Sequence, residues 1–381
     1  MARIIVGTYM VRYPIGGMLS WALQYVLGYH RLGHEVYIVE KGFYPHACYD
    51  LDRRCMTDDP SAGLRHVTAL LKRFGLDQRF CFVDYHGVHH GLSKARTSDL
   101  FRSADLFVDS GAHGAWSEEA ADVHRTALID GEPGFTQMKW ANAVAAGHAI
   151  PRYGFYYTNG TLLGSPACSA PTVGLPWRPL FNPVVPELFE QGPPPPPHAA
   201  YTTVMNWQSH KPITFENQAY GQKDLEFEHF MDLPSRTNAA LEVAVSGAAP
   251  QERLASHGWR MVSAKAVTAT FDHYRRYIHQ SRGEFSVCKN VFVAHRTGWF
   301  SDRSAAYLAS GRPVVLQETG FSQSLPTGEG LFAVNTPQEA ADAIAQIESD
   351  HARHAAAARA IAREHLSAEV VLGRMLRDTL G

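Results

Sequence analysis

The polar run at positions 301–304 has the residue types of an anion site. Ser301 is a good helix N-cap, and Asp302 suits the positive end of a helix. Arg303 and Ser304 follow, and Arg303 brings a positive charge into a first turn where the helix dipole favours an acid. Because free N–H groups at a helix N-terminus hold phosphate, we predict a bound anion at this turn. The alternative is an exposed Arg on a surface helix.

The elements around this run predict a βαβ unit. Residues 287–293 (VCKNVFV) have the pattern of a buried strand, and a loop containing Gly298 follows. The predicted helix ends at Gly311, and Val314–Leu316 forms a second buried strand. In open α/β sheets, ligands bind beyond the carboxyl ends of the strands, which is where residues 298–304 and 318–320 are predicted to lie.

The run AYLASGRPVVLQETG at 306–320 resembles the donor-site signature of GT-B glycosyltransferases, most closely the retaining, family-4-like members. Those enzymes carry two glutamates for donor sugar and ribose, and the matching positions here are Gly298 and Ala306. The resemblance therefore implies that other groups, such as Asp302 or Glu318, hold the sugar and ribose. It also leaves the stereochemical outcome open. Thr319 and Gly320 complete the predicted donor site.

Two lysines are candidates to neutralise a donor diphosphate. In the family an Arg and a Lys after the first strand of the second domain do this, and the usual Gly-Arg is replaced here by Asn206 and Trp207. Lys211 and Lys223 are the nearest cations, and Lys223 precedes a predicted helix. A solvated lysine is the alternative for each.

Acids and a histidine follow two predicted strands of the first half. Asp109 and His113 lie in a glycine-rich loop after Leu106–Val108, and Glu132 follows Ala127–Ile129. His113, Asp109 or Glu132 could serve as the base of an inverting transferase. The alternatives are a capping Asp109, a solvated His113 and a carboxylate exposed to solvent.

The first loop of the chain also lies at a strand end. It contains Gly17, but it is not a clean G-x-G-x-x-G and lacks the acid that binds a dinucleotide ribose, which disfavours a dehydrogenase. A Gly-Gly pair before a long helix is typical of the acceptor domain of GT-B enzymes, where it can approach the donor phosphates. The alternative is a tight turn in which Gly17 has a positive φ.

Composition excludes several classes of protein. The formal net charge is −2 and charged residues make up 19%, so there is no electrostatic footprint of a nucleic-acid binder. The start MARIIVG reads as a strand rather than a signal peptide, and no apolar run approaches the roughly 20 residues that span a membrane. We therefore expect a cytoplasmic protein. The five cysteines include no C-x-x-C pair, which favours buried free thiols over disulfides.

Three histidines, His86, His89 and His90, lie within five residues of one another and are candidate metal ligands. No acid or thiol falls at a standard ligand interval from them, so we predict no metal site and interpret the segment as a loop near the cleft or plain surface.

The chain of 381 residues is too long for one core and is predicted to form an α/β GT-B fold with two Rossmann-like domains facing a cleft. The predicted units are an acceptor-binding domain (1–190), a proline-rich linker (191–200), a nucleotide-sugar-binding domain (201–365) and a terminal helix (366–381). An alanine-rich helix is expected from Thr336 to about His365. The resemblance implies that the terminal helix crosses back to pack on the first domain.

The predicted function is glycosyl transfer (EC 2.4 class) from a nucleotide-diphosphate donor to a small-molecule or carbohydrate acceptor. No metal and no cofactor beyond the nucleotide sugar is expected, and UDP or TDP is preferred to GDP. No nucleic-acid partner and no integral membrane segment are expected, while a homodimer is left open. The alternatives are a GT-B type nucleotide-sugar 2-epimerase and a non-catalytic two-lobed ligand-binding or scaffold protein.

Overall fold

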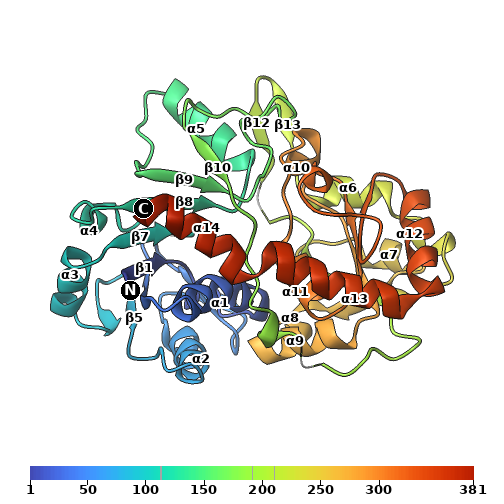
Figure 1. The fold of residues 1–381 in the computed structure, drawn as a ribbon, viewed down its shortest axis with the longest axis horizontal. Helices are drawn as coiled ribbons and strands as arrows, with labels where there is room; N and C mark the ends of the chain where they lie inside the picture. Colours follow the sequence, from blue (N-terminus) through green and yellow to red (C-terminus); the bar gives the residue numbers. More distant parts are fainter. Residues whose placement is uncertain (112–113, 191, 210) are drawn as a thin grey trace.

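The computed structural model describes residues 1–111, 114–190, 192–209 and 211–381. Two separate, mainly parallel sheets organise these residues (Figure 1). All strands of the first sheet precede residue 180, and all strands of the second lie between 201 and 334. The predicted domain boundaries at 190 and 200 fall in the connection between them, and they stay a prediction.

The first sheet is parallel except for its last strand, β6, which runs antiparallel to β5. In spatial order its strands are β10 (Trp177–Pro179), β9 (Phe155–Thr158), β8 (Thr126–Asp130), β7 (Leu106–Asp109), β1 (Arg3–Gly7), β2 (Glu35–Lys41), β5 (Phe80–Val83) and β6 (His89–Gly91). Ile4, Ile5 and Val6 are consecutive and all fully buried, as expected of a central strand covered on both faces. Its helices are α1 (Gly16–Arg31), α2 (Ser61–Lys72), α3 (Lys94–Arg102), α4 (Ser117–Ala120) and α5 (Phe135–Ala145).

The second sheet is parallel throughout. In spatial order its strands are β15 (Arg260–Ser263), β14 (Leu241–Ser246), β11 (Tyr201–Asn206), β16 (Gly283–Ser286), β17 (Val314–Gln317) and β18 (Leu331–Val334). Its helices are α6 (Lys223–His229), α7 (Gln251–Ser256), α8 (Ala264–Val267), α9 (Phe271–Gln280), α10 (Asn290–Ala294), α11 (Asp302–Ala309), α12 (Pro337–Ser349) and α13 (His351–Ile361). Two hairpins, β3–β4 (Cys48–Asp50, Cys55–Thr57) and β12–β13 (Ile213–Phe215, Gln218–Tyr220), stand outside both sheets.

Two sequence expectations about elements are wrong. No strand forms at 287–293: strand β16 already ends at Ser286, and the short helix α10 begins at Asn290. A short apolar run is compatible with either state, and tertiary packing decides between them. The alanine-rich helix breaks at Asp350, whose side chain accepts from the Arg353 N–H and caps a new helix, α13.

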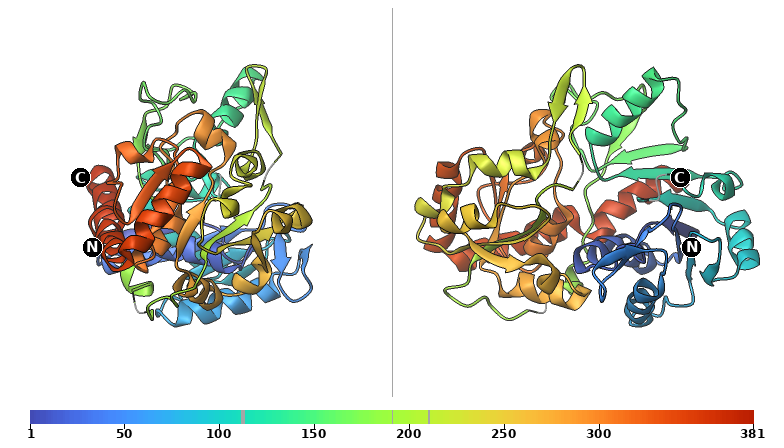
Figure 2. Two further views of the ribbon diagram at one scale, coloured as in Figure 1. Left: turned by 90° about the vertical axis from the view of Figure 1, so that its right-hand side faces the viewer. Right: turned by 180° about the vertical axis from the view of Figure 1, so that it is seen from behind.

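The last helix, α14 (Ala368–Leu380), crosses back to the first sheet, as the fold prediction required (Figures 1 and 2). It packs on α1: a Cβ placed on Gly28 would lie 2.5 Å from the Cδ1 atom of Leu372. The Tyr29 hydroxyl also lies 3.1 Å from the Met375 sulfur. The glycine therefore permits the close crossing of α1 and α14.

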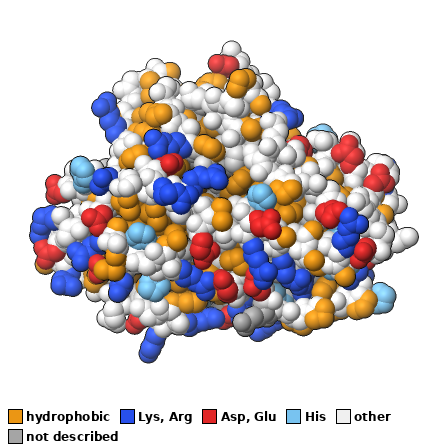
Figure 3. All heavy atoms as spheres, in the orientation of Figure 1, with side chains coloured by type: hydrophobic (Ala, Val, Ile, Leu, Met, Phe, Trp, Pro, Cys, Tyr) orange, Lys and Arg blue, Asp and Glu red, His pale blue; other side chains and the backbone are white. Residues whose placement is uncertain are grey.

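Charged side chains of both signs are interspersed over the face shown in Figure 3. No helix within the described ranges is long and apolar enough to cross a bilayer. The cysteines are all free, and Cys48, Cys81 and Cys288 are buried as predicted, whereas Cys55 is exposed.

Candidate functional site

The turn into α11 forms as the sequence predicts. Ser301 caps the helix by accepting from the Arg303 N–H at 3.2 Å, and Gly311 ends it with φ +65°. The preceding loop is held to the segment after β17, because the Gly298 N–H donates to the Thr319 carbonyl at 2.7 Å. Trp299 pairs with Gly160 of the first half in an isolated bridge. The turn therefore lies where the two halves of the chain meet.

A cavity of about 280 Å³ opens at this turn, between the carboxyl ends of the two sheets. Asp302 and Arg303 of α11 line it from one side, and Gly17 of α1 and Glu132 after β8 line it from the other. The N-termini of α1 and α11 thus line the same cavity. This arrangement favours a negatively charged ligand there. Gly17 does not have a positive φ, so the tight-turn alternative is wrong.

Arg303 is occupied by the protein itself. Its Nε donates to Glu284 at 2.5 Å, its Nη2 to the Ser286 hydroxyl at 2.6 Å and its Nη1 to the Val204 carbonyl at 3.0 Å. Glu284 is completely buried on β16, and this ion pair raises the pKa of Arg303 above its ordinary value against the opposing effect of burial. The anion predicted beside Arg303 therefore exists, but it is a carboxylate of the same chain.

Lys223 is the cation that remains unpaired. It begins α6 and is only 7% exposed, yet its ammonium has no hydrogen bond or ion pair within the described residues. Burial, with the nearby charge of Arg303, lowers the pKa of Lys223 to about 7. Lys223 is not among the residues that line the cavity, so its part in binding a ligand stays a prediction.

Glu132 lies at the wall between the two halves of the molecule. Its carboxylate receives Lys289 Nζ on both oxygens at 2.6 Å, an ion pair between residues 157 positions apart. About a third of the Glu132 side chain remains exposed. Lys289 was missed by the sequence reasoning because it sits in the run misread as a strand.

The other predicted catalytic residues have different surroundings. Asp109 is fully buried, and its Oδ2 accepts from the Gly114 N–H at 2.9 Å and the Tyr153 hydroxyl at 2.6 Å. It fastens the loop after β7, in the manner of the capping alternative. His113 lies outside the described residues. Of the predicted catalytic residues that the structure describes, Glu132 is therefore the one that reaches the cavity.

Two asparagines are among the polar residues of the cavity that sequence reasoning missed. Asn159 follows β9 and is 1% exposed; its amide donates to the Leu180 carbonyl at 2.8 Å, while its Oδ1 is buried with no partner in the described part of the chain. Asn182 accepts from Trp21 Nε1 and from the Tyr25 hydroxyl, each at 3.2 Å. An unpartnered carbonyl oxygen aimed at a cavity is a ready acceptor for a ligand hydroxyl.

Glu40 is a further buried acid that the sequence did not reveal. It accepts from the backbone N–H groups of Met10, Val11 and Arg12 at 2.7–2.9 Å, and Arg12 Nε lies 3.2 Å away. These bonds offset the burial that raises the pKa of Glu40. Glu40 therefore fixes the loop that leads into α1 and the cavity.

Several predicted donor residues serve the scaffold. A Cβ on Gly298 would lie 2.4 Å from the Thr161 hydroxyl, so the glycine is needed for contact between loops. Thr319 donates to the Trp299 carbonyl at 2.6 Å, and Glu318 folds back onto the Gly320 N–H. Ser304 is fully buried. None of these side chains lines the cavity.

The residues predicted to bind the donor after β11 differ in how far they are buried. Trp207 is buried and packs on Phe227 with ring centroids 5.5 Å apart, whereas Asn206 and Lys211 are exposed. These residues lie at the carboxyl end of the sheet but are not in the cavity lining. Their role in binding a nucleotide stays a prediction.

The histidine segment does not converge on one point. His90 Nε2 lies 2.9 Å from Asp84 Oδ2, while His89 Nδ1 lies 3.5 Å from the Cys81 sulfur. No group of three or more potential metal ligands gathers within the ranges that the structure describes.

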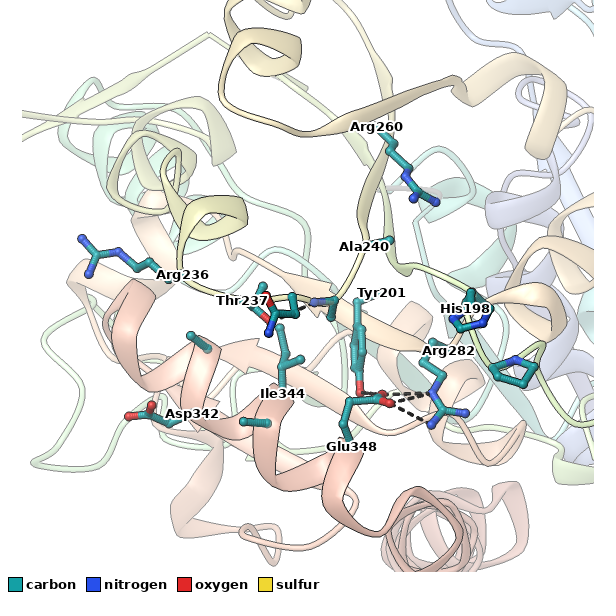
Figure 4. Close-up of a pocket in the computed structure, with 16 residues that line it drawn as sticks. His198, Tyr201, Arg236, Thr237, Ala240, Arg260, Arg282, Asp342, Ile344 and Glu348 are labelled. Carbon is teal, nitrogen blue, oxygen red and sulfur yellow. Dashed lines mark hydrogen bonds and ion pairs between the residues drawn. The ribbon is translucent and has the colours of Figure 1, made fainter.

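A larger cavity, of about 660 Å³, lies at the opposite, amino-terminal end of the second sheet (Figure 4). Tyr201 and Arg282 both point to Glu348 there, at 2.7 Å and 2.8 Å. These contacts satisfy the carboxylate internally, and the location is at the strand ends where α/β sheets do not usually bind ligands. We therefore place the candidate site in the smaller cavity between the sheets.

Comparison with known proteins bears on the fold. No protein-family model and no curated protein sequence matches the chain. A structure of HepE from Anabaena with UDP-glucose is similar, with a TM-score of 0.58 and 11% identity over 99% of both chains. An alpha-glucosyltransferase with UDP and a mismatch-containing 13-mer DNA has a TM-score of 0.57 and 9% sequence identity over 99% of both chains. Sucrose-phosphate synthase from Thermosynechococcus elongatus has a TM-score of 0.53 and 12% sequence identity, also over 99% of both chains. The chain has the GT-B fold, as its sequence predicted.

Proposed function

We propose that this protein is a glycosyltransferase that moves a sugar from a nucleoside-diphosphate donor to a small-molecule or carbohydrate acceptor. The observation that carries the proposal is the cavity between the carboxyl ends of the two sheets, where the N-termini of α1 and α11 meet. HepE was solved with UDP-glucose and the alpha-glucosyltransferase with UDP, and we infer a UDP-linked donor for this chain, with TDP the next choice and GDP less suited.

The diphosphate would be held by backbone N–H groups and by Lys223. As the bond between sugar and diphosphate breaks, negative charge collects on the leaving group, and positioned donors stabilise that charge most. Lys223 does not line the cavity itself, so we infer that the diphosphate extends past the cavity lining to reach its ammonium. Arg303 does line the cavity, but it is bound to Glu284 and holds the α11 turn in place. Protein cations in this role make a metal ion unnecessary, as we proposed from the sequence.

The sugar would be recognised by oxygen acceptors around the cavity. The Asn159 Oδ1 has no protein partner, and Asp302 and Glu132 line opposite walls. Burial raises the pKa of Asp302, and the positive charge and N–H of Arg303 oppose that effect. These groups take the place of the paired glutamates that are absent at Gly298 and Ala306.

Glu132 is our candidate for the general base. It is the described acid that lines the cavity from the first sheet, the side expected to hold the acceptor. A carboxylate there can remove the proton of an acceptor hydroxyl as the oxygen attacks the sugar. For this step one Glu132 oxygen must give up its contact with Lys289 and accept from the acceptor hydroxyl instead. Such a direct displacement would invert the anomeric centre, and NMR of the product would show this outcome.

Calorimetric titration with UDP, TDP, GDP and ADP tests the proposal. We expect micromolar binding of UDP. Lys223→Met should weaken it by about 10–100-fold, because a charge-assisted bond is worth about 1.5–3 kcal/mol. Lys265→Met, which removes an exposed lysine of α8, is the matched control and should leave binding unchanged. Failure of all four nucleotides to bind would reject the proposed function.

A further inference from the structure

A second cavity, of about 630 Å³, lies beside the first on its acceptor side. It is bounded by the carboxyl end of β8, by α5 and by residues 149–153. Ile129 and Glu132 line both cavities. The candidate base therefore stands at the wall between the proposed donor site and this larger space.

The walls of the second cavity are largely apolar and aromatic. They include the rings of Phe43, Phe135, Trp140 and Tyr153. Phe43 is 52% exposed, which is a large apolar area to leave in contact with water. A surface of this kind stabilises a ligand that can bury it.

The positions of two of these rings are fixed by neighbours. Trp140 packs on Trp177 with centroids 5.9 Å apart, and Tyr153 is held by its hydrogen bond to Asp109 at 2.6 Å. On its far side α5 is braced by the β12–β13 hairpin of the second half, through the bond from Asn142 to the Thr214 carbonyl at 2.9 Å (Figure 1). The rings therefore form a preorganised surface, which lowers the entropic cost of binding.

Polar groups in the second cavity are few and unevenly placed. The Asp130 carboxylate is used internally, accepting from the Thr136 and Thr158 hydroxyls and the Gln137 amide at 2.6–3.0 Å. Lys139 is exposed at the rim. Glu132 stands at the donor side. A carbohydrate, with a hydroxyl on nearly every carbon, would find few hydrogen-bond partners on these walls.

We infer that the acceptor is an apolar, ring-bearing small molecule with a hydroxyl directed at Glu132, rather than a carbohydrate. This inference rests on the proposed function. The volume lies within the range of about 300–1,000 Å³ in which proteins hold drug-sized ligands. In the transfer, the acceptor oxygen forms a bond to the anomeric carbon, the carbon–oxygen bond to the diphosphate breaks, and its electron pair leaves with the diphosphate. The hydroxyl proton goes to Glu132.

Binding and transfer with defined probes test the inference. The probes are 2-naphthol and umbelliferone, compared with glucose and maltose, and binding is measured by fluorescence and calorimetry in the presence of UDP. Ala143→Phe fills the second cavity from α5, and we expect it to weaken probe binding at least tenfold while UDP affinity stays within twofold. Val144→Phe changes the adjacent, 48% exposed residue, which is not in the lining, and should change neither affinity.

A second variant keeps the test valid even if Ala143→Phe fails to fold. Trp140→Ala removes an aromatic wall without adding bulk, and it should also weaken binding of the aromatic probes. UDP binding without cavity-dependent binding of any aromatic probe would overturn the acceptor inference alone. Transfer to glucose or maltose in preference to the aromatic probes would also overturn it. Absence of UDP binding to the unaltered protein would instead reject the proposed function.

Discussion

At the scale of single residues, the site is defined by which charges have partners. Arg303 and Lys223 both lie at the carboxyl end of the second sheet, and both are more than nine-tenths buried. Glu284 neutralises Arg303, so Arg303 belongs to the scaffold, whereas Lys223 feels the Glu284 charge but makes no ion pair among the described residues. Burying an unpaired ammonium costs free energy, and we expect a bound anion to offset that cost.

The buried pair of Arg303 and Glu284 should be essential for stability. Arg303→Met leaves the Glu284 carboxylate buried without its cation, and we expect a loss of about 3–5 kcal/mol in the free energy of unfolding, measured by chemical denaturation. Arg253→Met breaks the exposed pair with Glu228 and should cost less than about 1 kcal/mol. Equal effects of the two variants would show that Glu284 does not depend on Arg303.

The lowered pKa of Lys223 predicts a pH dependence. Between about pH 7 and 10.5 the unfolded chain holds a proton on this amine that the folded chain has released, so stability should rise with pH across this window. Below about pH 7 the amine is charged in both states, so the folded protein bears the full cost of the buried charge. Above pH 10.5 the amine is neutral in both states, so that destabilisation is absent. Denaturation curves of Lys223→Met should lack this rise. The same rise in that variant would assign it to another group.

Ligand binding should show the opposite trend. A diphosphate that pairs with Lys223 returns the proton, so UDP affinity should fall by up to about tenfold per pH unit between pH 7.5 and 9. Calorimetry in buffers of different ionisation enthalpy would detect the proton uptake. In Lys223→Met the affinity should be lower and independent of pH. Binding to the unaltered protein without proton uptake would place the diphosphate away from Lys223.

At the scale of elements, the start of α1 sets the width of the cleft. The Gly16 N–H donates to the Thr268 carbonyl at 2.7 Å, and a Cβ on Gly16 would lie 2.4 Å from the Thr270 carbonyl oxygen. Gly17 has room, because its Cβ would meet only the Tyr274 ring at 3.9 Å. The first glycine therefore joins the two halves of the chain, and the second faces the cavity.

This difference separates the effects of two adjacent substitutions. Gly16→Ala should lower the free energy of unfolding by about 1–3 kcal/mol through overpacking. Gly17→Ala should keep stability but weaken UDP binding by about tenfold, because a methyl group would keep a phosphate from the helix N-terminus. Thermal unfolding and calorimetry on both variants measure this. Unchanged UDP affinity in Gly17→Ala would remove the α1 terminus from the donor site.

At the scale of the whole molecule, contacts far apart in sequence hold the two sheets around the cavity. Lys289 reaches across to Glu132, Trp299 pairs with Gly160, and α14 returns from the second half to cover α1. The last helix thus stabilises the sheet to which it is not adjacent in sequence.

Loss of α14 packing should therefore affect the first sheet first. Leu372→Ala empties a fully buried site and should cost about 2–5 kcal/mol. Hydrogen exchange should quicken in α1 before it does in β14. Val370→Ala, at a 37% exposed position of the same helix, should have little effect. Equal acceleration in β14 and α1 would contradict local control by α14.

The sequence by itself determined the elements whose signals are local. The cap at Ser301, the stop at Gly311 and the run of apolar residues at 314–316 lie within a few residues of the structures they specify. The GT-B fold itself was predicted from the resemblance of residues 306–320 to a donor-site signature. Only the tertiary structure decided which charges are paired, because the pair of Glu132 and Lys289 joins residues 157 positions apart. It also turned part of the predicted strand at 287–293 into α10, and it assembled the aromatic cavity from separate segments. Local patterns fix backbone conformation, whereas burial and charge pairing depend on contacts that form only when distant segments pack together.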